Sequence, residues 1–159
     1  MPVPAPAFAA DAMLGRLARW LRVLGWDTQY DAAIDDHALV RLADEEARLL
    51  LTRDRHLLRE LRPARALEIR HDAPLAQLHD VVRRLDLAPP AELFTRCLLC
   101  NTLLTALARE EAAPLLPAGV RGLDVAVRHC PSCRRLYWDG SHVRRMRAAI
   151  ERTLPGWLA

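Results

Sequence analysis

The 159-residue chain contains no lysine, so all 23 of its basic residues are arginine. Without lysine it cannot complete a phosphate-binding loop of the Gly-x-x-x-x-Gly-Lys type, and it also lacks the Gly-x-Ser-x-Gly elbow of many hydrolases. No uncharged apolar run approaches the roughly 18–20 residues of a membrane span. The apolar start, Met1–Phe8, has no preceding basic residue of the kind a signal peptide carries. We therefore expect neither a membrane protein nor a secreted one.

Cysteine is also scarce, and all four cysteines fall into two Cys-x-x-Cys pairs. A two-residue gap lets one tight turn direct both sulfurs toward a single metal, and four thiolates suit tetrahedral zinc. Two disulfides or four buried small side chains are the alternatives, but nothing in the sequence indicates secretion. We predict a structural zinc site and a reducing, cytoplasmic location. The predicted zinc ligands are Cys97, Cys100, Cys130 and Cys133.

The segment Asp86–Glu92, which contains two consecutive prolines, separates two parts of opposite charge. Up to Glu92 there are 13 arginines against 15 acidic residues, and after it 10 against 5, so the formal charges are −2 and +5. A proline pair stops a helix and stiffens a linker. We therefore expect two domains, residues 1–88 and 93–159. An acidic first domain suits cations and a basic second domain suits phosphates, although solvated surface arginine is the simpler explanation for any single position.

Short apolar runs alternate with segments of helical periodicity throughout the first domain. We expect strands at 5–10, 27–30, 48–52 and 66–69, and helices at 13–24, 36–46, around 57–61 and 74–85. The run Leu49–Leu51 is apolar on both faces, as a buried parallel strand requires. This alternation predicts an α/β, Rossmann-like fold, in which a parallel sheet is covered by helices.

An aspartate stands at each predicted junction between a strand and the following helix. Asp11 ends the first strand, Asp36 (with Asp35 beside it) opens the second helix, and Asp54 and Asp72 follow the third and fourth strands. Helix capping explains any one of them. The junctions nevertheless share the carboxyl edge of the sheet, where open α/β folds bind ligands. Converging carboxylates need a cation between them, and hard oxygen ligands select Mg²⁺ or Mn²⁺.

Several blocks of sequence, in their order and spacing, resemble one protein family. The blocks are Phe8–Asp27, Asp35–Leu39, Leu49–Arg55, Arg96–Leu103, Cys130–Cys133 and Tyr137–His142. They are similar to the PIN-like RNase domains named after the C-terminal part of the Mut-seven protein, over residues 8–146. The resemblance implies a PIN-like α/β domain fused to a C-terminal zinc ribbon, with metal-dependent ribonuclease activity.

The resemblance also implies which residues act. Asp11, Asp36 and Asp54 match the acidic positions of the family, and Asp72 matches a weaker fourth position. The family often has a glutamate in the second helix, so Asp35, Glu45 and Glu46 stay open as further members of the site. One or two Mg²⁺ or Mn²⁺ ions at these aspartates would activate water for hydrolysis of an RNA phosphodiester. Phosphotransferases with an aspartate nucleophile want a second aspartate two positions on, where this chain has Met13.

The second domain carries the candidate RNA contacts. A helix is expected to begin near Ser141, with an apolar face formed by Val143, Met146, Ile150 and Leu154, so its arginines should face solvent. Tyr137 and Trp138 either stack on unpaired bases, which favours single-stranded RNA, or pack the ribbon core. His129, beside Cys130, is expected to be a strand residue. The predicted RNA contacts are Arg134, Arg135, His142, Arg144, Arg145 and Arg147.

Two function classes follow from these observations. The favoured one is a metal-dependent ribonuclease, because all three acidic positions remain carboxylates. The alternative is a non-catalytic RNA-binding or protein-adaptor module, in which the aspartates only cap helices and the ribbon docks onto a partner.

Overall fold

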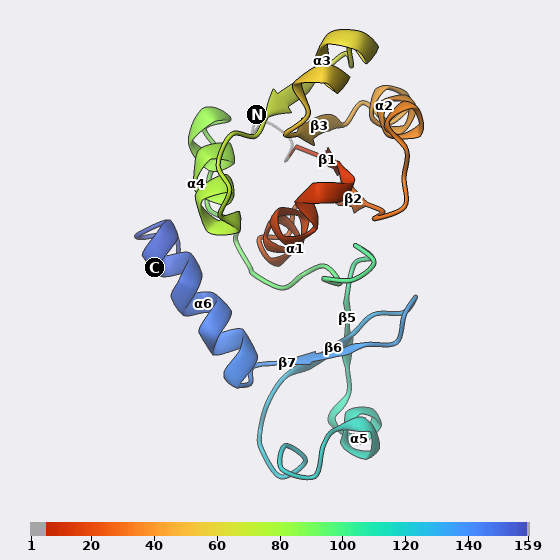
Figure 1. The fold of residues 1–159 in the computed structure, drawn as a ribbon. Helices are drawn as coiled ribbons and strands as arrows, with labels where there is room; N and C mark the ends of the chain where they lie inside the picture. The colour runs from red at the N-terminus through yellow and green to blue at the C-terminus, as the bar shows by residue number, and fades with distance from the viewer. Residues whose placement is uncertain (1–5, 159) are drawn as a thin grey trace.

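The computed structural model describes residues 6–158. Ala5, where we expected the first strand to begin, lies outside these residues, as does Ala159 at the end of the second predicted domain. The chain forms a four-stranded sheet with helices around it, followed by a three-stranded sheet and a C-terminal helix (Figure 1). No helix within residues 6–158 is both long enough and apolar enough to cross a membrane.

The first sheet is entirely parallel, with the strand order β2-β1-β3-β4. Its strands are β1 (Phe8–Ala10), β2 (Thr28–Tyr30), β3 (Leu49–Thr52) and β4 (Ala66–Glu68). They are shorter than the apolar runs suggested, and β1 begins two residues after Pro6, which has no N–H to donate to a strand ladder. Ala10 pairs with Tyr30 on one side and with Leu51 on the other. The prediction of a parallel sheet flanked by helices is confirmed.

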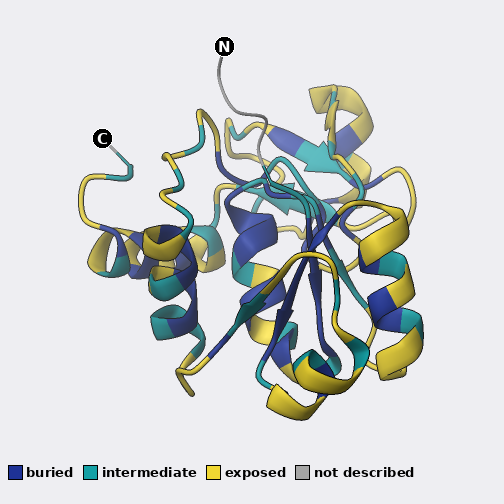
Figure 2. Cartoon of the chain, turned by 90° about the horizontal axis from the view of Figure 1, so that it is seen from above, coloured by how far each residue is buried: buried dark blue, intermediate teal, exposed yellow. Residues whose placement is uncertain are grey.

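The helices cover both faces of this sheet, as Figure 2 shows. They are α1 (Gly15–Val23, after a 3-10 turn at Ala12–Leu14), α2 (Asp36–Glu45), α3 (Arg55–Leu61) and α4 (Pro74–Arg84). Side chains alternate along the strands: Ala9 and Leu50 pack toward α2 and α3, whereas Phe8 and Leu51 pack toward α1 and α4. The buried Leu49–Thr52 strand therefore contributes to two cores at once.

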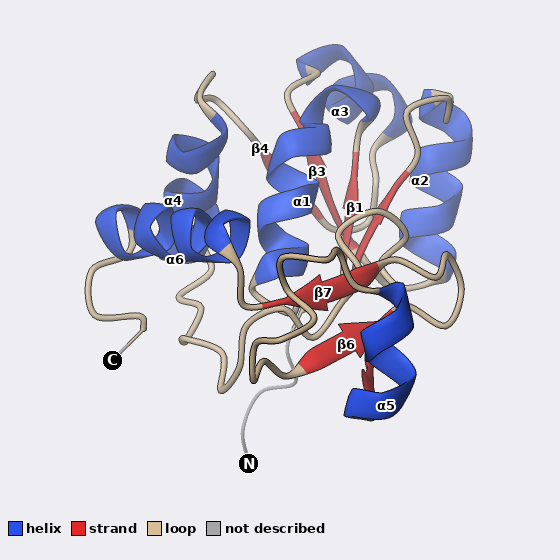
Figure 3. Ribbon diagram, turned by 90° about the horizontal axis from the view of Figure 1, so that it is seen from below, coloured by secondary structure: helices blue, strands red, loops and turns tan. Residues whose placement is uncertain are grey.

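The C-terminal part contains an antiparallel sheet of the order β5-β6-β7 and the longest helix (Figure 3). The elements are β5 (Thr105–Leu107), α5 (Arg109–Ala112), a 3-10 turn (Ala113–Leu115), β6 (Val127–His129), β7 (Leu136–Trp138) and α6 (Ser141–Thr153). His129 is a strand residue, as expected, and its Nδ1 lies 3.0 Å from Thr105 Oγ1.

Helix α6 has the predicted apolar face, but that face is buried against the first part of the chain. Met146, Ile150 and Leu154 belong to the same core as α1 and α4, and Ile150 is fully buried. The arginines of α6 are exposed. The apolar core therefore continues across the segment that the sequence marked as a boundary.

This continuity predicts the effect of truncating Ile150. We expect Ile150→Ala to lower the free energy of unfolding by about 2–5 kcal/mol, because the helix is too constrained to fill the resulting cavity. The loss should appear in a single urea transition followed by both circular dichroism and tryptophan fluorescence. The exposed neighbour variant Arg145→Ala should change stability by no more than about 0.5 kcal/mol. Two separate transitions, with only the smaller one shifted by Ile150→Ala, would instead support independent domains 1–88 and 93–159.

Candidate functional site

The strand order places two of the candidate aspartates at the centre of the sheet edge. Strand β1 leads to β2 on one side of it, and the chain then crosses to β3 on the other side. Open α/β sheets bind ligands at such a reversal, beyond the carboxyl ends of the central strands. Asp11 directly follows β1, and Asp54 lies two residues beyond the end of β3.

Asp11 is 6% exposed and is held by three hydrogen bonds. Its Oδ1 accepts from the Met13 amide at 2.9 Å, which caps the turn before α1. Its Oδ2 accepts from the Thr52 hydroxyl at 2.5 Å and from the Arg53 amide at 3.2 Å. These donors fix the carboxylate in the gap between β1 and β3.

Asp54 is exposed and is linked to Asp11 through one side chain. Asp54 Oδ1 caps α3, accepting from the His56 amide at 2.8 Å and the Leu57 amide at 3.1 Å. The Asp54 amide donates to Thr52 Oγ1 at 3.0 Å, and the Thr52 hydroxyl in turn donates a hydrogen bond to Asp11. Thr52 is fully buried, so its hydroxyl positions both aspartates together.

The remaining acidic candidates occupy different positions. Asp35, not Asp36, caps α2, through a bond from the Ala38 amide to Asp35 Oδ1 of 2.9 Å. Asp36 is the first residue of α2 and is exposed, as are Glu45 and Glu46 at the far end of the helix. The Asp36 carboxylate therefore does not cap α2, which was the structural role that we considered for it.

Asp72 does not cap α4, whose N-cap residue is Ala73. The Asp72 side chain is 92% exposed and pairs with Arg53 Nη2 at 2.5 Å. Because the Arg53 amide also bonds Asp11, this ion pair lies at the same edge of the sheet as the aspartates. An exposed ion pair contributes little to stability, so its main effect is to orient the Arg53 guanidinium.

Within residues 6–158, the four cysteines are the one group of three or more His, Cys, Asp or Glu residues whose possible donor atoms all lie within 4.8 Å of one another. The aspartates at the sheet edge are thus more widely spaced than the ligands of a fully protein-bound ion. Magnesium usually keeps several waters and takes only one or two carboxylates directly, so such spacing suits Mg²⁺ better than a closed cage does.

The cysteine centre has the geometry of a closed metal site. Cys97 and Cys133 Sγ are 3.4 Å apart, as are Cys100 and Cys130 Sγ. A tetrahedral ion with bonds of about 2.3 Å would separate its sulfurs by roughly 3.8 Å, so small adjustments would admit zinc. The cluster is consistent with the predicted zinc ribbon and could hold zinc.

The two Cys-x-x-Cys turns have the same backbone geometry. In each, the residue after the second cysteine adopts a left-handed conformation, with φ of 71° at Asn101 and 63° at Arg134. The amide of that residue donates to the carbonyl of the first cysteine, at 2.9 Å to Cys97 and 2.8 Å to Cys130. Asparagine adopts this conformation readily, but arginine does so at a cost.

Tyr137 connects the first turn to the ribbon sheet. Its hydroxyl accepts from the Leu98 amide at 3.0 Å and lies 3.2 Å from Cys97 Sγ, to which it can donate. Burial raises the pKa of the Cys97 thiol, but bonds from Tyr137 and from turn amides outweigh burial and bring the pKa below its usual value. The pKa of Cys133 is raised to about 12, against a backbone bond from Arg135, by burial and by its sulfur neighbours. A cation is needed to hold all four sulfurs as thiolates.

A buried arginine joins the first turn to α1. Arg22 is 3% exposed, and it donates to the carbonyls of Thr28, Leu98 and Leu99, each at 3.0 Å. Burial lowers the pKa of the guanidinium, while the nearby sulfurs of Cys100 and Cys97 act in the opposite direction. Arg22 thus lies close to the sulfurs of Cys97 and Cys100, which would supply negative charge as thiolates.

A second link runs through Asn101. Its Oδ1 accepts from the Thr28 amide at 3.0 Å and its Nδ2 donates to Asp27 Oδ1 at 2.7 Å. Arg48 also bonds Asp27, at 2.8 Å. Burial raises the pKa of Asp27, but these bonds outweigh burial, so the pKa lies below its usual value. The first cysteine turn is therefore fastened to β2 by buried polar contacts.

The predicted RNA contacts are all exposed; they are Arg134, Arg135, His142, Arg144, Arg145 and Arg147. His142 Nε2 lies 3.2 Å from Nη2 of Arg19 on α1, a residue to which we had assigned no role. Sequence reasoning also missed Thr52, Arg22 and Asn101. Each of these residues lay inside a block that carried the family resemblance. Arg22 also lies next to the apolar stripe of α1, and this position could have indicated that it is buried.

Comparison with protein-family models finds a match to the Mut7-C RNase domain over residues 6–150. Searches of curated proteins and of solved structures find no match. The match covers the parallel sheet, the cysteine centre and most of α6.

The contact between Tyr137 and Cys97 predicts a loss of zinc affinity in Tyr137→Phe. Removing a side chain that hydrogen-bonds to a metal ligand typically weakens metal affinity 10–100-fold, and we expect that range here. Competition with a chromophoric chelator at fixed pH measures it. Tyr30→Phe is the matched control, because the Tyr30 hydroxyl bonds Ala12 O at 2.9 Å, away from the cysteines. Equal zinc affinity in Tyr137→Phe and the parent would contradict the role of this hydroxyl.

The left-handed conformation of Arg134 predicts that Arg134→Gly stabilises the protein. Glycine adopts this conformation without strain, so we expect the free energy of unfolding to rise by up to about 1 kcal/mol. Arg135→Gly removes the same charge at a position without positive φ, and it should destabilise instead. If Arg134 also contacts RNA, Arg134→Gly should bind RNA more weakly despite its greater stability. Thermal unfolding and RNA titration of both variants separate the two effects.

Proposed function

The chain belongs to the Mut7-C RNase domain family, and from this premise we propose that it is a metal-dependent ribonuclease whose catalytic Mg²⁺ or Mn²⁺ is held by Asp11, Asp36 and Asp54. The observation that carries the proposal is the hydrogen-bonded series Asp11–Thr52–Asp54 at the reversal of strand order. Open α/β sheets bind their ligands at this point of the fold.

The carboxylates retain oxygen atoms that a cation can use. A carboxylate offers about four acceptor positions, and Asp11 uses three of them. Asp54 accepts both of its capping bonds on Oδ1, which leaves Oδ2 without a donor among residues 6–158. The Asp36 carboxylate accepts no hydrogen bond from the described part of the chain. Free carboxylate oxygens are hard donors, which suit Mg²⁺ or Mn²⁺.

The residues around these oxygens have separate roles in phosphodiester hydrolysis. When bound, Mg²⁺ or Mn²⁺ supplies a Lewis acid that activates water and stabilises negative charge on the departing oxygen. Thr52 holds Asp11 and Asp54 at a constant separation. Arg53, oriented by Asp72, offers a guanidinium to a phosphate at the same edge.

We assign RNA binding to the C-terminal part. The arginines of α6 have their apolar neighbours buried and their own side chains exposed, so they are free to neutralise phosphates. We propose that zinc occupies the four-cysteine centre, that the protein works in a reducing cytoplasm, and that single-stranded RNA is the substrate. The exposed arginines, close to the half-buried Trp138, suit a flexible strand with unpaired bases.

One observation supports the alternative of a non-catalytic RNA-binding or adaptor module. Asp11 and Asp54 both cap helical turns, which gives them a structural role without any metal. The experiment below therefore separates capping from catalysis.

Asp54→Asn should abolish RNA hydrolysis and leave the fold intact. Asparagine can keep Oδ1 on the amides of His56 and Leu57, because it caps helices about as well as aspartate. It replaces the free Oδ2 by an NH₂ group that cannot bind a cation. Cleavage of a labelled single-stranded RNA in Mn²⁺ measures the effect, with thermal unfolding as the test of fold.

Asp44→Asn is the matched control. Asp44 is an exposed carboxylate that also accepts a backbone bond, from the Ala64 amide at 2.9 Å, and it lies on the last turns of α2. We expect Asp44→Asn to cleave like the parent. Equal cleavage by Asp54→Asn and the parent, or no cleavage of any RNA by the parent, would favour the non-catalytic module.

A further inference from the structure

A cavity of about 180 Å³ lies where α1 meets the cysteine centre and the start of α6. Arg19 of α1, Leu99 of the first cysteine turn, and Trp138 and His142 contribute to its lining. A cavity of roughly 150 Å³ accommodates benzene, so this one accommodates an aromatic heterocycle. Both parts of the chain are needed to form it.

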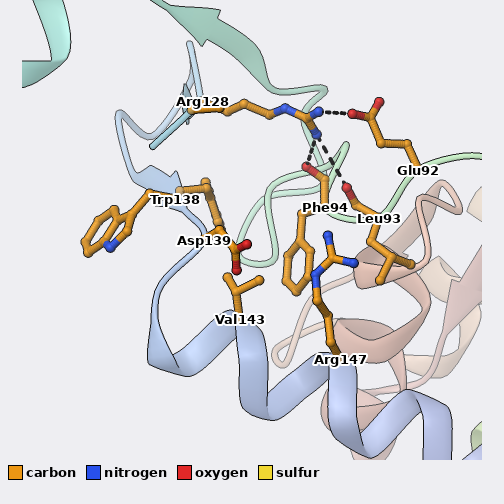
Figure 4. Close-up of a pocket in the computed structure, with 10 residues that line it drawn as sticks. Glu92, Leu93, Phe94, Arg128, Trp138, Asp139, Val143 and Arg147 are labelled. Atoms are coloured by element: carbon orange, nitrogen blue, oxygen red, sulfur yellow. Dashed lines mark hydrogen bonds and ion pairs between the residues drawn. The ribbon is translucent and has the colours of Figure 1, made fainter. Parts of the chain in front are cut away.

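The charge of the lining distinguishes this cavity from its neighbour. Apolar side chains form most of its wall. Its basic side chains are Arg19, Arg135 and His142, Tyr137 also lines it, and no carboxylate is among the lining residues. A neighbouring cavity of about 160 Å³ shares Trp138 but is lined by Glu92 and Asp139 as well as by arginines (Figure 4). Only the first cavity therefore offers an apolar wall with an uncompensated cationic edge, which suits a ring attached to phosphates.

Figure 4 shows why the second cavity is less suitable. The guanidinium of Arg128 reaches Glu92 and the backbone carbonyls of Leu93 and Phe94, so three of its five N–H donors are already used and its charge is paired with a carboxylate. The Arg128–Phe94 bond is 2.9 Å and holds Phe94 in a left-handed conformation with φ of 57°. That cavity is thus bordered by a contact that stabilises the chain reversal after the proline linker.

Arg19 has donors available for a phosphate. The one side-chain hydrogen bond that Arg19 forms within residues 6–158 joins Nη2 to His142 Nε2. A guanidinium has no acceptor, so His142 Nε2 accepts in this contact. The remaining N–H groups of Arg19 are exposed beside the cavity, and Arg19 forms no ion pair with the described carboxylates.

Helix α1 leads from this cavity to Asp11. Arg16 and Arg19 are exposed and spaced by three residues, so they lie on one side of α1. Met13, in the preceding 3-10 turn, is three residues before Arg16 and is also exposed. The path from Asp11 to Arg19 is roughly 12–14 Å along the helix axis. Met13 is 79% exposed at one end of the path, and Leu99 is 56% exposed at the other.

We propose that an unpaired nucleobase of single-stranded RNA occupies the cavity beside Trp138, that Arg19 and Arg135 bind the adjoining phosphates, and that the strand then follows α1 past Arg16 to Asp11. This site deepens the proposed ribonuclease function and rests on it for the path toward Asp11. It assigns a substrate-binding role to α1, which lies outside the basic ribbon.

The test measures RNA binding in the Asp54→Asn background, so that cleavage does not interfere. The probes are a fluorescein-labelled single-stranded oligouridine and a duplex of equal length, in buffer with free zinc and no chelator. We expect Arg19→Ala to weaken single-strand binding about tenfold and to reduce the slope of log affinity against log salt by about 0.7. Arg59→Ala removes the same charge from α3, across the sheet from α1, and should bind like its background.

A second variant tests whether a nucleobase stacks on Trp138, and it does so without removing the indole ring. A Cβ added at Gly140 would lie 2.9 Å from Trp138 Nε1, so Gly140→Ala must displace the indole. Loss of one stacking contact should weaken single-strand binding by roughly 5- to 150-fold. Duplex binding should change far less, because paired bases cannot enter the cavity. Unchanged thermal unfolding of both variants excludes a general loss of fold.

The outcomes separate this proposal from the proposed enzyme. If Arg19→Ala and Gly140→Ala weaken single-strand binding while the parent cleaves no RNA, the cavity assignment stands and the ribonuclease proposal fails. If the parent cleaves RNA but both variants bind like their background, the cavity assignment fails. It fails equally if the protein binds no RNA, or if it binds the duplex as tightly as the single strand.

Discussion

The hydrogen bonds of Arg22 hold the parallel sheet and the cysteine centre in one arrangement. A buried guanidinium is costly unless its donors are satisfied and negative charge lies nearby. Arg22 meets both conditions, because three carbonyls accept from it and the sulfurs of Cys97 and Cys100 are close. With zinc among four thiolates the centre would carry a net charge of −2, which the buried cation partly offsets. Moving the first cysteine turn away from α1 would leave the Arg22 guanidinium without the carbonyls of Leu98 and Leu99. This cost opposes independent movement of the two parts of the chain.

Helix α1 consequently determines distances across the whole molecule. The 3-10 turn that precedes it is capped by Asp11, its last turn carries Arg22, and its exposed side carries Arg16 and Arg19. A helix of nine residues is short and stiff, so the sheet edge, the cysteine centre and the cavity beside Trp138 keep constant spacing. The apolar face of α6, which shares one core with α1 and α4, reinforces this arrangement. A substrate held at one end of α1 is therefore presented at a defined distance from the other end.

Much of this fold could be predicted from local patterns in the sequence. The Leu49–Leu51 run and the apolar stripes predicted a parallel sheet with helices, and the spacing of the cysteines predicted one four-ligand centre. Local patterns do not specify which surfaces meet. The apolar face of α6 showed that Ile150 would be buried, but not that its neighbours would be α1 and α4. Thr52 reads as an ordinary strand residue, and its role depends on β1 and β3 being adjacent. Between Asp35 and Asp36, the choice of cap depended on where α2 begins, to within one residue.

The structure also changes the question that the sequence raised about capping and metal binding. The two were alternatives while each aspartate was considered as a single acceptor, but a carboxylate has two oxygens. Asp54 caps α3 through two bonds to Oδ1 alone, which leaves Oδ2 without a donor among the described residues. Capping thus removes the rotational freedom that a metal ligand would otherwise lose on binding, which lowers the entropic cost of capturing an ion. Asp11 is restrained in the same way through Thr52 and Met13. An aspartate that caps a helix at the carboxyl edge of a parallel sheet would therefore be a preorganised ligand for the proposed ion, and the two roles are compatible.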